Sequence, residues 1–582
     1  MKLIIKEYLA SLKERNELDV LLPILLSQMG LTILTEPSIG TRQYGVDISA
    51  YGSINGEPDK VYLFTIKAGD LGRAHWDKGS VQDVRASLHD ILDTYIPTHI
   101  PPQLKDLPIE VCITYGGDLK EDIALTLSQF EKAKETEKIK LTRWSGDLIA
   151  GHLETYLLNE QLFLQDDLKS LLRKSLAMVD QPEISFQHFS RLIQKLFQDL
   201  ENQSIKNQLT TLRQSYLALG ILNSWCLSEN NIESSYLSAE RLILHSWQVV
   251  KSFASKKTAD AKKIKNIFKS LTLLYLSISD TYYQRLLPHF SSLHAISNAV
   301  HGNCDVDINL RLFDVIGRVS LFGIWLDWAF DRMYRNSTDQ NIIEDASRTY
   351  GEISEALKKL IMNNPLLFHP YKDDQAIDIG LTAFYWLKNN KNDGDLQGWL
   401  SGITRTILGA FTHNKRYLSN IHDYLELVLH PVDDSQEYRE SVTKGSILYP
   451  LLGFFAKVFQ NSEMHLDIKR ITTEFIPKCT LQIWHPDADT ETHLYSNSDT
   501  HGLGITGISN ETRETPFNQI KENCSLDKYI LELSAVKYEH FPIILTACRH
   551  YRLPIPYHFY FQLLGIDIYT DEAKDQETEH EV

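Results

Sequence analysis

The stretch that decides the fold is Tyr44-Gly45-Val46-Asp47-Ile48, followed after a turn at Asn55-Gly56 by Phe64-Thr65-Ile66-Lys67. An Asn-Gly pair between two such segments is the strongest short-range signal for a β-hairpin. Because alternate residues on a strand share a face, we expect the Asp47 and Ser49 side chains to lie on the same face of the first strand. By the same rule Thr65 and Lys67 share a face of the partner strand. A carboxylate and an ammonium so placed indicate either a metal-assisted hydrolytic site or an ordinary surface salt bridge.

Helices and strands are expected to alternate on both sides of this hairpin. A helix with apolar residues at helical spacing covers 18–29, and Gly30 is a typical C-terminal stop. Pro23 inside it should kink the helix or mark its first turn. Downstream, the patterns predict a helix over 81–95, a strand over 108–115, a helix over 121–134, a strand over 139–144 and a further helix from 146. The order predicts an α/β domain over residues 1–165, with a mixed sheet flanked by helices.

Three segments of this domain resemble the PD-(D/E)XK nucleases of the restriction-endonuclease-like superfamily, and within it the Mrr-like branch. They are the opening helix that ends in Gly30, the pair Gly45-Val46-Asp47-Ile48 and Thr65-Ile66-Lys67, and the strand-turn-helix Trp144-Ser145-Gly146-Asp147-Leu148-Ile149. The resemblance implies a restriction-endonuclease-like fold. It also implies hydrolysis of phosphodiester bonds with Mg²⁺ or Mn²⁺, with Asp47 as a metal ligand and Lys67 positioning the attacking water.

The chain departs from the family pattern at Thr65, where the family has Glu or Gln. A hydroxyl is a poor Mg²⁺ ligand beside a carboxylate, so an active enzyme needs a second acid. The opening helix offers Asp19, the preferred candidate catalytic residue and metal ligand, or Glu17. Glu36 and Asp70 are less favoured. Alternatively, Asp19 and Glu17 only interact favourably with the helix dipole at a solvated helix start. For the site as a whole, the alternative is a degenerate fold that binds nucleic acid without cutting it.

Polar residues near the hairpin are candidates for substrate contact. Gln43 could order the metal's waters or the backbone, although an ordinary polar loop residue is the commoner explanation. Arg73, His75 and Trp76 follow the second strand in a polar loop. Arg73 is a candidate nucleic-acid contact or a plain surface residue, and Trp76 fits packing better than base stacking.

The remainder of the chain is expected to be mainly α-helical. Apolar residues recur at three- and four-residue spacing over 166–450, without a fixed repeat period. Residues 451–570 are expected to be mixed but mostly helical, and 571–582 to form an acidic, disordered tail. Irregular helical pairs of this kind commonly bind a protein partner or form oligomers, which is an analogy at the level of fold.

One lysine-rich run stands out in the helical part. It contains Lys251, Lys256, Lys257, Lys262, Lys263, Lys265 and Lys269, with Asp260 as its one acid. Such a run could follow a phosphate backbone, with Lys256, Lys257, Lys262 and Lys263 as candidate nucleic-acid contacts. A solvated linker is the alternative. The first 165 residues contain no comparable cluster.

Composition limits the cellular setting. The net charge of −17 argues against a general affinity for nucleic acid, although it leaves room for a local basic surface. The six cysteines have no metal-binding spacing and fit a reducing compartment. No signal peptide and no apolar stretch long enough to span a bilayer is recognised. We therefore expect a cytoplasmic protein without membrane contact.

These observations favour a Mg²⁺-dependent nuclease, with DNA preferred over RNA as substrate, joined to a helical region that senses a trigger or a partner. Nuclease domains with long helical extensions resemble bacterial restriction and phage-defence effectors. The competing interpretation is a catalytically inactive binding or scaffold protein that kept the nuclease fold.

Overall fold

The computed structural model describes residues 6, 9–10, 12, 14, 18–35, 44–54, 56–79, 83–153, 156, 166–300, 304–334, 340–389, 394–496 and 502–569. The predicted candidates Glu17, Glu36 and Gln43, and the tail over 571–582, lie outside these residues. The chain divides into two compact units. Unit 1 is Met1–Ser238 with Asn266–Leu271, and unit 2 is Ala239–Lys265 with Thr272–Val582. The predicted domain limits near residues 165 and 450 stay predictions.

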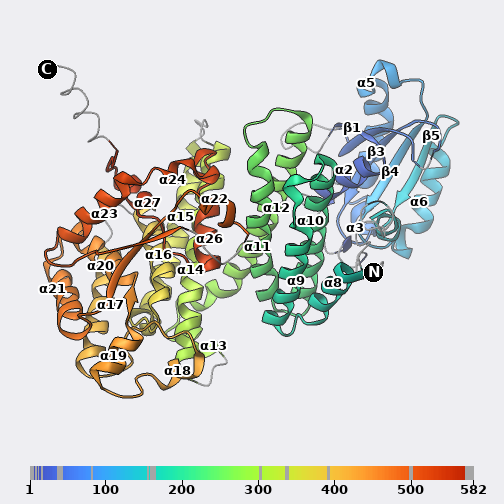
Figure 1. Ribbon diagram of the computed structural model, residues 1–582. Helices are drawn as coiled ribbons and strands as arrows, with labels where there is room; N and C mark the ends of the chain where they lie inside the picture. Colours follow the sequence, from blue (N-terminus) through green and yellow to red (C-terminus); the bar gives the residue numbers. More distant parts are fainter. Residues whose placement is uncertain are drawn as a thin grey trace, which may run out of the picture. The chain divides into compact units, whose positions relative to one another are not determined.

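Unit 1 begins with an α/β arrangement around a five-stranded mixed sheet (Figure 1). Its elements are α2 (Asp19–Gln28), β1 (Thr32–Thr35), β2 (Ile48–Gly52), β3 (Lys60–Lys67), α3 (Arg73–Trp76), α4 (Val84–Asp90), η2 (Ile91–Tyr95), α5 (Ile96–His99), η3 (Pro102–Leu104), β4 (Ile109–Tyr115), α6 (Glu121–Lys134), β5 (Ile139–Trp144) and α7 (Gly146–His152). The strand order is β1-β2-β3-β4-β5, in which β1, β2 and β3 are antiparallel and β3, β4 and β5 are parallel. The predicted mixed sheet flanked by helices is confirmed.

The alternation of side chains along β3 divides the sheet into two buried faces. Val61 and Leu63 belong to the core cluster that also contains residues of β4, α4, η2 and α6. Phe64 points to the opposite face and meets the edge of Trp144 at 5.0 Å between ring centroids. Burial on both faces is what the run of apolar residues in β3 requires.

Gly45 allows the hairpin to approach α4 closely. Its φ is +77°, and a Cβ atom there would lie only 2.2 Å from the carbonyl oxygen of Ser87. A larger residue would therefore clash with α4 as well as strain the backbone. The Gly45 turn delivers the chain to Asp47 at the start of β2.

Three further helices lie wholly within unit 1: α8 (Asp166–Ala177), α9 (Pro182–Phe197) and α10 (Ile205–Ser228). The first two pack as a helical hairpin. Leu172 and Leu176 of α8 and Phe189 and Leu192 of α9 are buried, at the three- and four-residue spacing of an amphipathic helix. Asp167, Arg173 and Lys174 of α8 are exposed.

Unit 2 is mainly helical, as predicted, and contains a small three-stranded sheet in the order β6-β7-β8. The boundaries with unit 1 fall within α11 (Glu233–Val250) and α12 (Ala259–Leu286). The other elements are η6 (Lys251–Phe253), η7 (Leu287–His289), α13 (Ala295–Ala299), α14 (Asp305–Tyr334), α15 (Gln340–Met362), η8 (Pro365–Phe368), η9 (Asp373–Gln375), α16 (Ala376–Asn389), α17 (Gly394–Thr412), α18 (Tyr424–Leu429), α19 (Gln436–Val442), β6 (Gly445–Ser446), α20 (Leu448–Val458), α21 (Ser462–Arg470), η10 (Ile471–Phe475), β7 (Thr480–His485), α22 (Thr490–His493), β8 (Leu503–Thr506), α23 (Thr515–Leu526), α24 (Tyr529–Glu532), α25 (Ser534–Lys537), α26 (Pro542–Tyr551) and α27 (Tyr557–Leu563).

A buried ionic contact ties three helices of unit 2 together. Arg549 of α26 donates two hydrogen bonds, of 2.7 and 2.8 Å, to the carboxylate of Glu240 in α11, and it also contacts Asp314 of α14. Burial disfavours the ionised form of Glu240, but the nearby positive charges hold its pKa below the ordinary value. The charges are compensated where helices pack, as buried charges must be. No helix in the described part of the chain has the length and apolar character needed to cross a membrane.

Candidate functional site

The Asp47 carboxylate is fixed at the point where the β2–β3 ladder ends. The Asp47 backbone N–H donates to the Phe64 carbonyl at 2.8 Å. Its Oδ2 accepts a hydrogen bond of 2.7 Å from the backbone N–H of Ile66. The Asp47 carboxylate thus takes the place of the next backbone carbonyl that would accept a hydrogen bond in the ladder. The orientation of the Asp47 side chain is therefore set by β3. Because one oxygen is engaged in this way, Asp47 is both a structural cap and a candidate ligand.

The surroundings of Asp47 resist its ionisation. Burial raises its pKa to about 6, while the Ile66 hydrogen bond and the positive charge of Lys67 act in the opposite direction. The negative charges of Glu14 and Asp19 raise the pKa further. Two acids from the N-terminal segment are therefore close enough to Asp47 to repel its charge. Clustered carboxylates of this kind are stabilised by a cation.

Lys67 provides one such cation. It is the last residue of β3 and is only 8% exposed. Its Nζ lies 3.4 Å from both carboxylate oxygens of Glu14. The ammonium is thereby held at the same end of β3 as Asp47. With Asp19, which lies in the first turn of α2, these residues form an acidic cluster around one lysine, and we call Glu14, Asp19, Asp47 and Lys67 the β3-end site.

Glu14 is the residue that the sequence analysis missed. The predicted helix acids were Asp19, which does influence Asp47, and Glu17, which lies outside the described residues. Glu14 precedes Asp19 by five positions. A pattern based on 3.6 residues per turn separates them.

Thr65 contributes no charge to the site. It lies two residues before Lys67, is 1% exposed, and pairs with Ile113 of β4. The site therefore has a buried neutral side chain at the position where the resemblance predicts a metal ligand.

Nearby candidates have structural partners. Asp70 accepts a hydrogen bond from the Asp118 backbone N–H at 2.8 Å and pairs with Lys120 at 2.7 Å, which explains it without a catalytic role. Trp76 is buried against Phe130, edge to face at 5.5 Å, as expected of a packing residue. Arg73 is exposed at the start of α3, where a substrate could reach it.

The predicted lysine run lies across η6 and the first turns of α12, most of it in unit 2. Lys256, Lys257, Lys262 and Lys263 are exposed. Lys263 pairs with Asp260 at 3.3 Å, and Lys256 lies over the Phe253 ring at 4.7 Å. Their role in binding nucleic acid stays a prediction.

The donor chemistry of the β3-end site fits a hard divalent cation, because carboxylate oxygens are the ligands that Mg²⁺ prefers. No group of three or more His, Cys, Asp or Glu side chains among the described residues has metal-binding geometry. Mg²⁺ is usually held by one or two carboxylates, with water and substrate oxygens completing its shell. Asp47 with Glu14 or Asp19 supplies that number of carboxylates.

Searches against family models, curated proteins and solved structures found no match to this chain.

Proposed function

We propose that unit 1 is a Mg²⁺-dependent nuclease that hydrolyses phosphodiester bonds at the β3-end site. The observation that carries the proposal is the convergence of Asp47 and Lys67 with the N-terminal acids Glu14 and Asp19 at one end of β3. Carboxylates beside a lysine, at the strand ends of a mixed sheet, suit hydrolysis of a phosphodiester. The resemblance of the hairpin motif to restriction-endonuclease-like nucleases supports the same activity, and with it a role in restriction or phage defence.

Each residue of the site has a distinct task in this proposal. Asp47, oriented by the Ile66 N–H, and Glu14 or Asp19 would hold Mg²⁺, or Mn²⁺ in its place. Glu14 also orients Lys67, whose ammonium would position the attacking water or a phosphate oxygen. When bound, the metal would neutralise the charge that develops on the phosphate.

A second candidate function is binding of nucleic acid without cleavage. The buried Thr65 favours it, because the site lacks the usual acid. The Asp47–Ile66 hydrogen bond favours it too, since it gives Asp47 a structural reason to persist. Both functions place nucleic acid at unit 1, and they differ in whether a bond is broken.

Cleavage of supercoiled plasmid and of labelled RNA in Mg²⁺ distinguishes the two. The wild type should nick or degrade one of these substrates. Asp47→Ala and Lys67→Ala should abolish cleavage while the circular dichroism spectrum is retained. Lys140→Ala removes an exposed lysine of β5 and should cut normally. Equal cutting by all variants would refute the site, and a wild type that binds but never cuts would favour the second function.

A further inference from the structure

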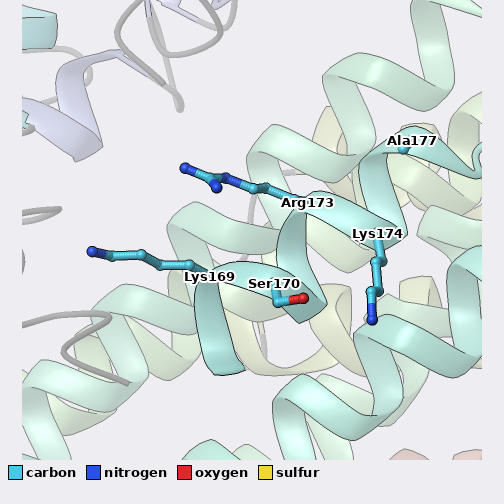
Figure 2. A pocket seen from close by; sticks show the side chains of 5 residues that line it. All are labelled: Lys169, Ser170, Arg173, Lys174 and Ala177. Atoms are coloured by element: carbon cyan, nitrogen blue, oxygen red, sulfur yellow. The ribbon is translucent and has the colours of Figure 1, made fainter. Parts of the chain in front are cut away.

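Helix α8 presents three cations around a surface hollow in unit 1 (Figure 2). Lys169, Ser170, Arg173, Lys174 and Ala177 line this hollow, whose volume is about 510 Å³. Figure 2 shows the Lys169 and Arg173 side chains extended in the same direction, one helical turn apart, and Lys174 leaving the helix in another direction. The charged groups reach outward, whereas Leu168, Leu172 and Leu176 of the same helix are buried. We call the three cations the α8 patch.

No acidic side chain that the structure describes is paired with the α8 patch. None of its three side chains forms an ion pair with any residue that the structure describes, although many other cations of this acidic chain do. On the adjacent helix α9, Lys195 is paired with Asp167 at 2.9 Å. Asp167 of α8 is therefore paired with a lysine of α9 and not with the α8 patch.

Helix α9 adds positive charge close to the α8 patch. Burial lowers the pKa of His188, and the charges of Lys174 and Arg191 lower it further. Lys174 and Arg191 therefore lie close enough to the same imidazole for their charges to act on it. Arg191 is exposed and, like the α8 cations, forms no ion pair with a described residue. The positive field extends across both helices of the hairpin.

We propose that the α8 patch binds the phosphate backbone of the nucleic acid on which unit 1 acts. The inference rests on the proposed function for its choice of ligand. Lys169 and Arg173 are four residues apart, or about 6 Å along a helix axis. One strand of a DNA duplex carries a phosphate about every 3.4 Å of its axis, so two cations at this spacing span about two phosphate steps of one strand. The patch would supply the positive surface that the first 165 residues lack.

The chemistry of α8 argues against an anionic membrane surface as the ligand. A helix that binds at a lipid interface inserts an exposed apolar face next to its cations. The apolar face of α8 is instead packed inside the protein, through Leu172 and Leu176 among others. The exposed residues of α8 are polar, charged or small, which suits contact with phosphates in water.

Fluorescence anisotropy with labelled duplex DNA in EDTA tests the proposal on the full chain, because binding is then measured without cleavage. The test variant is Lys169→Gln/Arg173→Gln/Lys174→Gln. The matched control, Lys105→Gln/Lys206→Gln/Lys537→Gln, removes the same charge from exposed lysines elsewhere. The slope of log affinity against log salt should become shallower by about 2.7 in the test variant, from about 0.9 per lost phosphate contact. The control should keep the wild-type slope.

Ser170→Glu gives a second, independent reading, because it introduces a negative charge among the three cations without removing any of them. It should weaken binding at low salt. An unchanged slope in the triple variant, or an equal loss in the control, overturns the proposal. The proposal is also overturned, in favour of a membrane surface, if the triple variant loses binding to vesicles of anionic lipid while its DNA binding is unchanged. If DNA binding depends on the patch but no DNA is cleaved in Mg²⁺, the proposed nuclease activity is rejected and the patch is kept. If DNA is cleaved but the triple variant keeps the wild-type salt slope, the patch is rejected and the nuclease activity is kept.

Discussion

The Lys67 ammonium nitrogen lies 3.4 Å from each carboxylate oxygen of Glu14, although the two residues are 53 positions apart. This contact ties the N-terminal segment to the end of β3. It also brings an acid to the site that has a threonine at position 65. The N-terminal segment is thus part of the chemistry proposed for unit 1, and Glu14 is its most direct contribution.

Glu14→Gln tests that contribution. The amide keeps the size of the side chain but loses the charge that orients Lys67 and could bind Mg²⁺. Loss of a group that orients a metal-site residue typically costs 10- to 100-fold in activity, and we expect a decrease of about that size in Mg²⁺-dependent cleavage. Glu121→Gln, at an exposed acid in the first turn of α6, is the control. Equal rates for Glu14→Gln and wild type would remove Glu14 from the site.

Asp47→Asn should change the pH dependence of stability. The pKa of Asp47 rises from 3.8 to about 6 on folding. Between these values the folded state retains a proton that the unfolded state has lost, so the free energy of unfolding falls as the pH rises. Asparagine is uncharged throughout this pH range, so the variant lacks this dependence on pH. From pH 4.5 to 7.5, the stability of Asp47→Asn relative to wild type should therefore increase, by about 2 kcal/mol.

Hydrogen exchange of peptides that contain β2 and β3 measures this change. Asp59→Asn, at an exposed position just before β3, should show no comparable change relative to wild type. Addition of Mg²⁺ at pH 7.5 should slow exchange in the wild type and not in Asp47→Asn, because a ligand stabilises only the state that binds it. A stability difference that does not vary with pH would contradict the buried charge.

Much of unit 1 could be predicted from the sequence, because its elements carry complete local signals. The predicted helix over 121–134 is α6 (Glu121–Lys134), and the predicted strand over 139–144 is β5 (Ile139–Trp144). Gly30 does end the opening helix, with φ of +96°. These elements have clear periodicity and boundaries within the segment itself.

The failures have non-local causes. The strand β1 (Thr32–Thr35) was missed because it has only four residues, lies at the edge of the sheet and lacks a buried face to impose alternation. Glu14 was missed because its partner Lys67 is 53 positions away in the sequence. The α8 patch was missed because acids at 166, 167 and 180 flank its cations, which hides them in a charge count. In the folded chain Asp167 is paired with Lys195 of α9.

Thr65→Glu restores the side chain that the nuclease resemblance predicts, at a position that is now buried. If Glu14 and Asp19 already serve the site, a further carboxylate raises the pKa of its neighbours by repulsion. Cleavage should then stay level or fall. Thr65→Val, which removes only the hydroxyl, should retain activity. A gain of Mg²⁺ affinity or cleavage in Thr65→Glu would show that the wild-type site is degenerate.

Glu240→Ala tests the ionic contact in unit 2. Removing one partner leaves Arg549 buried without its bidentate carboxylate, and such a change typically costs about 3–5 kcal/mol. The thermal unfolding midpoint of unit 2 should fall clearly, whereas Glu522→Ala at an exposed site should leave it unchanged. The double variant Glu240→Met/Arg549→Met should recover stability, because no charge is left buried by that pair. No recovery would show that the contact cannot be replaced by apolar packing.

Calorimetric titration of Mg²⁺ tests the central claim most directly, since it asks whether the acids of the β3-end site bind the metal. The wild type should bind one Mg²⁺ in the presence of a non-cleavable oligonucleotide. Asp47→Asn should abolish that binding, and Glu14→Gln or Asp19→Asn should weaken it about 10-fold or more. The exposed-acid control Glu121→Gln should bind as the wild type does. Wild-type binding that survives loss of Asp47 and of both N-terminal acids, or no binding by the wild type, would contradict the assignment of this site.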